Sequence, residues 1–232
     1  MTLADRIIAY NRSLEFTGLL PPGIRIMNPF RNNPHAIRIS QNFYTKYYND
    51  NKPRFLILGI NPGRFGAGAT GIPFTDTIRL NEKCGIPVDS FRTYEASSAF
   101  IYEMIDAFGS VKAFYEKFFV SAVCPLGFTR TNDKGTAVNY NYYDSKELTQ
   151  AVYNFITENL EKQLRLGIDT TLCYCLGTGK NEDFLRKLNE RQRFFKTIIA
   201  LEHPRFIMQY KVKSKKLYIE KYLSAFNFPG KN

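Results

Sequence analysis

Two side chains in this sequence have the chemistry and the position to help break a bond. His203 is one of only two histidines and follows an apolar run at residues 197–201. A neutral imidazole can donate a hydrogen bond to a developing negative charge, an interaction of about 3 to 4 kcal/mol. Asn61 follows another apolar run, at residues 55–60. Its amide can orient a water molecule but cannot take its proton, which suits a reaction whose bond breaks largely before the nucleophile arrives. The structural alternatives are a strand-end cap for His203 and a turn residue before Pro62 for Asn61.

The segment that contains Asn61, residues 59–74, holds five glycines and two prolines. Residues 66–71 fit the G-x-G-x-x-G pattern of dinucleotide-binding proteins, but that pattern turns directly out of a strand and opens a helix. Here the apolar run ends several residues earlier, and Pro73 stands where a helix would continue. We therefore expect no nucleotide cofactor.

Apolar runs and helical periodicity alternate along the chain. The runs lie at residues 55–60, 118–123, 170–176 and 197–201, and amphipathic segments lie at 7–14, 37–48, 94–108, 146–164, 182–190 and 212–226. This alternation predicts an α/β fold, a three-layer α/β/α sandwich with a central four-stranded parallel sheet. Ligands of such sheets bind beyond the carboxyl ends of the strands. We expect Asn61 and His203 at neighbouring strand ends, with Phe74 beside them.

The composition favours a nucleic-acid partner. The 232 residues include 32 Lys and Arg against 21 Asp and Glu, a net charge of +11, which attracts polyanions, although a coat of solubilising lysines is the alternative. The length favours a single domain over residues 1–232. The four cysteines lack metal-site spacing, so we expect neither a metal nor a disulfide. Because no signal peptide or membrane span is visible, we expect a cytoplasmic, monomeric protein.

Three segments resemble the single-strand-selective monofunctional type of the uracil-DNA glycosylase superfamily. The first is Gly-hydrophobic-Asn-Pro-Gly-x-Phe-Gly at residues 59–66, followed by Thr-Gly-x-Pro-Phe at 70–74; the others are Cys-Pro-Leu at 124–126 and the His-Pro of His203. The resemblance implies a base-excision repair enzyme that hydrolyses the N-glycosidic bond of a flipped base, with no cofactor. By the same resemblance, Asn61 positions water, His203 donates to O2 of the base, Ile60 belongs to the base-binding segment, Gly63 leaves room beside C5, and Phe74 stacks on the base.

One recognition residue of that family is missing. The family carries Asn before the hydrophobic-Cys-Pro-Leu sequence and uses it to read the uracil edge, whereas this chain has Ala122. Base reading must then shift to backbone groups, to Ser121, or to the amides and rings of residues 139–143, among them Asn141. An ordinary surface turn is the alternative for residues 139–143.

The segment after His203 is basic and apolar. Arg205 is followed by Phe206, Ile207 and Met208, which could fill the gap that a flipped base leaves in DNA. Residues 205–221 carry a net charge of +5. We expect Arg205 and Lys211 to contact phosphates, and Phe206 and Ile207 to contact the DNA stack.

The competing hypothesis is a non-enzymatic nucleic-acid-binding protein on the same fold, which the loss of the reading Asn keeps open. A pocket for a single base, shared by Asn61 and His203, distinguishes the two hypotheses. The sequence does not rank uracil, 5-hydroxymethyluracil, xanthine and hypoxanthine as substrates, nor single-stranded against double-stranded DNA.

Overall fold

A computed structural model describes residues 1–31 and 33–227. Its central sheet consists of four parallel strands in the order β3-β2-β6-β7: β2 (Arg54–Gly59), β3 (Phe118–Ala122), β6 (Ile168–Leu176) and β7 (Thr197–Leu201). The four strands predicted from apolar runs are therefore confirmed, to within two residues at their ends. The prediction that Asn61 and His203 follow adjacent strands is wrong. Asn61 follows β2 and His203 follows β7, and β6 lies between these two strands.

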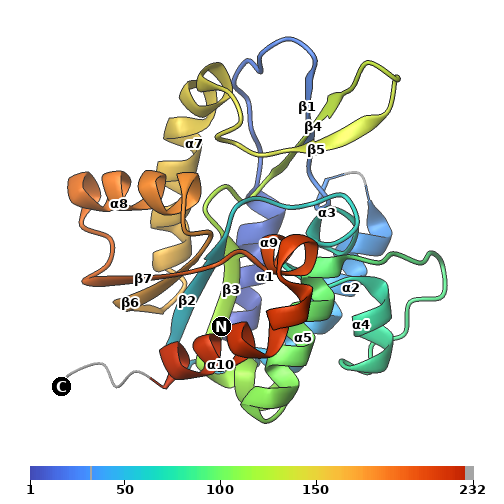
Figure 1. The fold of residues 1–232 in the computed structure, drawn as a ribbon, viewed down its shortest axis with the longest axis vertical. Helices are drawn as coiled ribbons and strands as arrows, with labels where there is room; N and C mark the ends of the chain where they lie inside the picture. Colours follow the sequence, from blue (N-terminus) through green and yellow to red (C-terminus); the bar gives the residue numbers. More distant parts are fainter. Residues whose placement is uncertain (32, 228–232) are drawn as a thin grey trace.

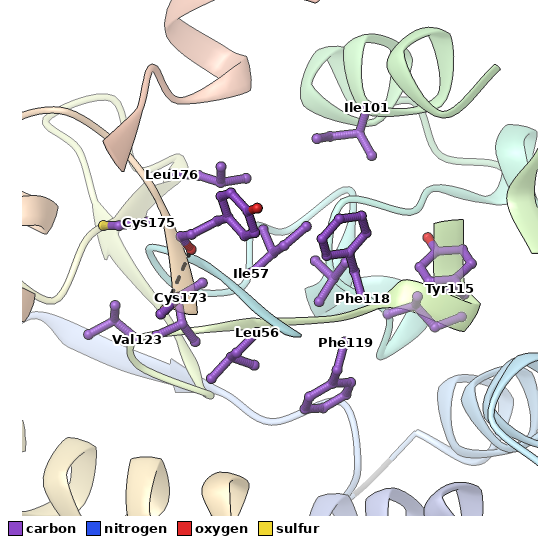
Figure 2. Close-up of a cluster of buried hydrophobic side chains, with 14 of the residues drawn as sticks. Leu56, Ile57, Ile101, Tyr115, Phe118, Phe119, Val123, Cys173, Cys175 and Leu176 are labelled. Atoms are coloured by element: carbon purple, nitrogen blue, oxygen red, sulfur yellow. Dashed lines mark hydrogen bonds between the residues drawn. The ribbon is translucent and has the colours of Figure 1, made fainter. Parts of the chain in front are cut away.

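Helices cover both faces of this sheet (Figure 1). Phe118 and Phe119 are consecutive residues of β3 and so point to opposite faces, as Figure 2 shows. The ring of Phe118 packs on Phe226 of α10 with centroids 4.6 Å apart, and the ring of Phe119 packs 5.9 Å from Tyr48 at the end of α2. The predicted three-layer α/β/α arrangement is confirmed.

Most helices begin where a capping side chain stands before an amphipathic segment. Thr2 and Asp5 form a reciprocal capping box, and the side chains of Asn33 and Ser145 cap the long helices that start at Pro34 and Lys146. The helices of the described residues are α1 (Leu3–Ser13), α2 (Pro34–Tyr47), α3 (Ala67–Thr70), α4 (Thr77–Glu82), α5 (Ala96–Phe108), α6 (Val111–Lys117), α7 (Lys146–Leu164), α8 (Lys180–Gln192), α9 (Pro204–Tyr210) and α10 (Lys215–Phe226).

Two local predictions need correction. The glycine-rich segment does form a helix, α3, but it is a single turn that ends at Gly71 in a left-handed conformation with φ of 73°. The last predicted helix, at residues 212–226, starts with a short 3-10 turn (Val212–Ser214), and α10 proper begins at Lys215. None of the helices in residues 1–31 and 33–227 has the length and apolar character needed to cross a membrane.

A second, antiparallel sheet was not predicted. It has the order β1-β4-β5 and consists of β1 (Ile24–Met27), β4 (Gly127–Thr131) and β5 (Ala137–Tyr140). Much of the polar and aromatic segment 127–144 is thus a β-hairpin rather than an irregular loop. The small sheet lies beyond the carboxyl end of β2 (Figure 1), where its residues contact the loop that contains Asn61.

Candidate active site

One pocket of about 260 Å³ brings together most of the residues singled out from the sequence. It lies beyond the carboxyl ends of β2, β3 and β7. Its lining residues are Gly59, Ile60, Asn61, Pro62, Gly63, Ala67, Pro73, Phe74, Glu95, Ser97, Ser121, Ala122, Asn139, Asn141, Tyr143, His203, Arg205, Phe206, Gln209 and Tyr210. Asn61 and His203 therefore face one cavity although their strands are not neighbours. The other histidine, His35, lies near Ser90 and does not line the pocket.

The backbone after β5 holds the side chain of Asn61 in place. The Asn61 Oδ1 accepts a hydrogen bond from the Tyr142 N–H at 3.1 Å, and Nδ2 donates to the carbonyl of Tyr140 at 3.3 Å. Because the backbone offers one donor and one acceptor, the positions of the oxygen and the nitrogen of the Asn61 amide are determined. The carbonyl oxygen retains one lone pair, with which it can orient a water molecule.

His203 is the N-cap residue of α9, and its cap contact decides where its proton lies. The Nδ1 atom accepts a hydrogen bond from the Arg205 N–H at 3.1 Å. A neutral ring that accepts at Nδ1 carries its proton at Nε2. Burial, together with the positive charge of Arg205, lowers the pKa of His203 to about 3. At neutral pH the ring is therefore an uncharged donor that lines the pocket.

Phe74 lines the same pocket as these two residues. Its ring centroid lies 5.6 Å from that of His203. Its backbone has a φ of 52°, a left-handed conformation that is costly for an aromatic residue. A β-carbon at Gly59 would lie 2.8 Å from Cζ of Phe74, so the glycine makes room for the ring. The strained backbone and the glycine together direct the ring into the pocket.

The other predicted base-contacting residues also line the pocket. Ile60 and Gly63 come from the loop after β2, and Ser121 comes from β3. Ala122 lines the pocket as well and presents only a methyl group. Asn141 lines the pocket, and its Nδ2 donates one hydrogen bond to Asp144 at 3.3 Å, which leaves its oxygen and a second N–H uncommitted.

The basic segment divides into a rim and a buried part. Arg205 and Phe206 line the pocket mouth, and Phe206 is 41% exposed. Ile207 is fully buried, and Met208 packs against the core. The prediction that Ile207 contacts DNA is therefore wrong, because helical periodicity turns this residue inward. Lys211 is exposed and lies outside the pocket lining.

Several lining residues carry polar groups that the sequence did not point to individually, among them Glu95 and Asn139. Glu95 stands at the N-cap of α5, yet its side chain makes no cap hydrogen bond. Asn139 belongs to the singled-out segment 139–143, and its Oδ1 accepts from the Arg64 N–H at 3.0 Å. The sequence holds one weak signal for Glu95. A glutamate stands at the N-cap position of a helix, where Ser, Thr, Asp and Asn are the preferred residues.

The described residues contain no group of three or more His, Cys, Asp or Glu side chains placed to hold a metal ion. The pocket's polar groups are amides, hydroxyls, one imidazole, one carboxyl and one guanidinium. Such a set can stabilise an anion and orient water.

The chain was compared with known proteins. A sequence profile described as the uracil DNA glycosylase superfamily matches residues 45–227. A solved structure described as the crystal structure of wild-type Pedobacter heparinus SMUG2 is 61% identical to the chain, covers 97% of each chain and superimposes with a TM-score of 0.95. No curated protein sequence matches. Since the profile spans more than half of the chain and the structural match nearly all of it, the chain belongs to the uracil DNA glycosylase superfamily and, within it, to the SMUG type.

Proposed function

We propose that this chain is a monofunctional DNA glycosylase of base-excision repair in which Asn61 and His203 carry out the hydrolysis of the N-glycosidic bond. The observation that carries the proposal is the state of His203. Its Nδ1 is committed to the Arg205 N–H, so its free donor, Nε2–H, belongs to the pocket. A pocket of about 260 Å³ accepts a single flipped base rather than a stretch of polymer.

The reaction separates the base from the sugar. The bond between C1′ and the base nitrogen breaks, and its electron pair leaves with the base. His203 donates a hydrogen bond to the base oxygen on which the negative charge grows. Asn61 orients a water molecule toward C1′, and the proton of that water passes to solvent. No lysine is among the described residues that line the pocket, in keeping with a water nucleophile instead of a Schiff base.

The pocket rim supplies a place for the DNA strand. Arg205 and Phe206 stand at the mouth on α9, and Lys211 follows at the end of that helix. Arg205 and Lys211 form no ion pair with the described acidic residues, whereas Lys215 and Lys221 pair with Glu103 and Glu202. We assign phosphate contacts to the first two. Phe206 is the residue placed to fill the gap in the stack.

The decisive experiment incubates the purified protein with single-stranded and duplex oligonucleotides that contain uracil, 5-hydroxymethyluracil, xanthine or hypoxanthine. We expect release of the free base and an intact abasic strand that is cut only after alkali treatment. Binding to these oligonucleotides without base release would instead support the nucleic-acid-binding hypothesis. Strand cleavage without alkali would exclude a monofunctional mechanism.

A further inference from the structure

The pocket contains a carboxyl group that the proposed reaction does not use. The Glu95 N–H donates to Oδ2 of Asp76 at 2.8 Å, which fixes the start of α5 and directs the Glu95 side chain into the pocket wall. Within residues 1–31 and 33–227, neither carboxyl oxygen of Glu95 accepts a hydrogen bond, and Oε2 is fully enclosed. An enclosed carboxyl group without a hydrogen-bond partner is energetically costly. A ligand in the pocket that supplied this partner would remove the cost.

The glycine-rich loop is shaped around this carboxyl. A β-carbon at Gly66 would lie 2.1 Å from Oε2 of Glu95, and one at Gly63 would lie 3.0 Å from Oε1. The same β-carbon at Gly63 would lie 3.5 Å from Nδ2 of Asn139. Because Oδ1 of Asn139 is taken by the Arg64 N–H, its Nδ2 is the free end. Oε1 of Glu95 and Nδ2 of Asn139 thus converge on the same corner of the pocket.

Three other residues of the pocket have little with which to read a base. Ala122 presents a methyl group, and both ends of the Asn61 amide are held by the backbone after β5. His203 has a single free donor, which the reaction uses. Ser121 and the side chain of Asn141 also line the pocket with uncommitted groups, but only Glu95 and Asn139 are shown to bring their free groups to one corner.

We propose that the Glu95 carboxyl, in its neutral acid form, and the Asn139 amide are paired hydrogen-bond donors to a carbonyl oxygen of the flipped base beside Gly63. This inference rests on the proposed function and names the groups that recognise its substrate. Together they replace the side chain that is absent at Ala122.

Burial, rather than the charges around it, favours the acid form of Glu95. Arg205 adds positive charge from α9, and Asp76, buried and paired with Arg79, adds negative charge from the α4 side. His203, which also lines the pocket, is uncharged. Burial dominates and raises the pKa of Glu95 to about 7. An ionised carboxylate would also oppose the negative charge that grows on the leaving base, whereas a neutral donor stabilises it.

The test compares Glu95→Gln and Glu95→Ala with the wild type in single-turnover release of uracil from a single-stranded oligonucleotide, between pH 6 and pH 8.5. Wild-type rates should fall about 30-fold across this range, as a group with a pKa of about 7 loses its proton. Glu95→Gln keeps an uncharged donor and should stay within about threefold of the wild-type rate at pH 6 while losing the fall at high pH. Glu95→Ala should be about 100-fold slower at pH 6, the loss expected for one preorganised donor.

Two further measurements complete the design. Glu158→Gln makes the same chemical change at an exposed position outside the pocket lining and should behave as the wild type at every pH. Asn139→Ala should weaken binding of an oligonucleotide that contains 2′-fluoro-2′-deoxyuridine, a poorly cleaved probe, as Glu95→Ala does, whereas Glu95→Gln should bind it normally.

A rate that rises through pH 7 and is abolished in Glu95→Gln would overturn the proposal, because Glu95 would then act as a carboxylate. Unchanged rates and probe binding in Glu95→Ala would overturn it too. If the wild type releases no base, the proposed function fails, and the pH-dependent binding of the fluorinated probe still decides the role of Glu95.

Discussion

Replacing His203 by asparagine separates the two tasks of this side chain. One is structural, since Nδ1 caps α9 by accepting from the Arg205 N–H. The other is the proposed donation from Nε2 to the leaving base. Asparagine is among the best N-cap residues, but its shorter side chain, once it caps the helix, cannot also reach into the pocket as the imidazole does. His203→Asn therefore keeps the cap and removes the donor.

The expected size of the effect follows from the protonation state. With a pKa of about 3, charging the ring at pH 7 would cost about 5 kcal/mol, so His203 acts as a neutral donor. One such donor, aimed at a developing anion, contributes about 3 to 4 kcal/mol to the transition state. Loss of that donor should slow base release at least about 100-fold in both His203→Asn and His203→Ala. Only His203→Ala should lose the cap, about 1 kcal/mol of the free energy of unfolding.

Two assays report these effects separately. Single-turnover release of uracil measures the chemical step, and thermal unfolding measures the cap, for which about 1 kcal/mol corresponds to a Tm lower by about 2 to 4 °C in a chain of this size. Binding of the fluorinated probe should be nearly unchanged in both variants. A His203→Asn variant that retains more than about a tenth of the wild-type rate would refute the assignment of the donor. Equal losses of Tm in both variants would refute the capping role.

The remaining predictions concern the loop, the rim and the support behind the pocket. Asn61→Ala should slow base release while lesion binding in a gel-shift assay stays largely intact, because the water loses its orienting partner; full activity would contradict this role. Lys211→Ala should reduce the log–log slope of DNA affinity against salt by about one unit, measured by fluorescence anisotropy, and an unchanged slope would remove Lys211 from the phosphate contacts. Phe206→Ala should process uracil poorly in duplex and normally in single strands, so equal losses on both would contradict the wedge role. Asn181→Ala leaves the buried Tyr142 hydroxyl without its 2.9 Å partner and should lower the free energy of unfolding in urea by about 1 to 3 kcal/mol; an additional Tyr142→Phe change should add little, and a fully additive loss would exclude this pairing.

The parallel sheet could be predicted from the sequence because its signals are local. Apolar runs of five to seven residues marked all four strands, and the end of a strand marked the places where Asn61 and His203 stand. Strand order is not a local property. The sequence places β7 after β6 but does not say which of the two pairs with β2, and the expectation of neighbouring ends failed for that reason.

The rest of the site depends on contacts between distant segments. Glu95 is separated from Gly63 and Gly66 by some thirty residues, and its role as a wall appears only when α5 packs beside the loop. The β-hairpin of β4 and β5 was hidden because its residues are polar and aromatic, so that no apolar run marked it. Ile207 was misplaced because exposure within a short helix follows from its packing, which the segment 205–208 does not reveal.

Strand order also explains why no reactive group comes from β6, the strand between those that carry Asn61 and His203. The carboxyl end of β6, between the two strands that carry Asn61 and His203, is closed by Gly177, whose N–H donates to the Leu201 carbonyl at 2.7 Å. The side chain of Asn181 donates a hydrogen bond to the Leu176 carbonyl at 3.1 Å, so this last carbonyl of β6 is also occupied. Neither residue lines the pocket.

The strands that carry the two proposed catalytic residues do not pair with each other. The side chain that packs between the ends of these strands is Phe74. Its ring reaches from Gly59 at the end of β2 to His203 beyond β7, and it does so from a left-handed backbone conformation. A strained aromatic residue at such a position persists only when its surroundings hold it. The spacing of Asn61 and His203 thus depends on Gly59, which admits the ring, as much as on the two strands that carry them.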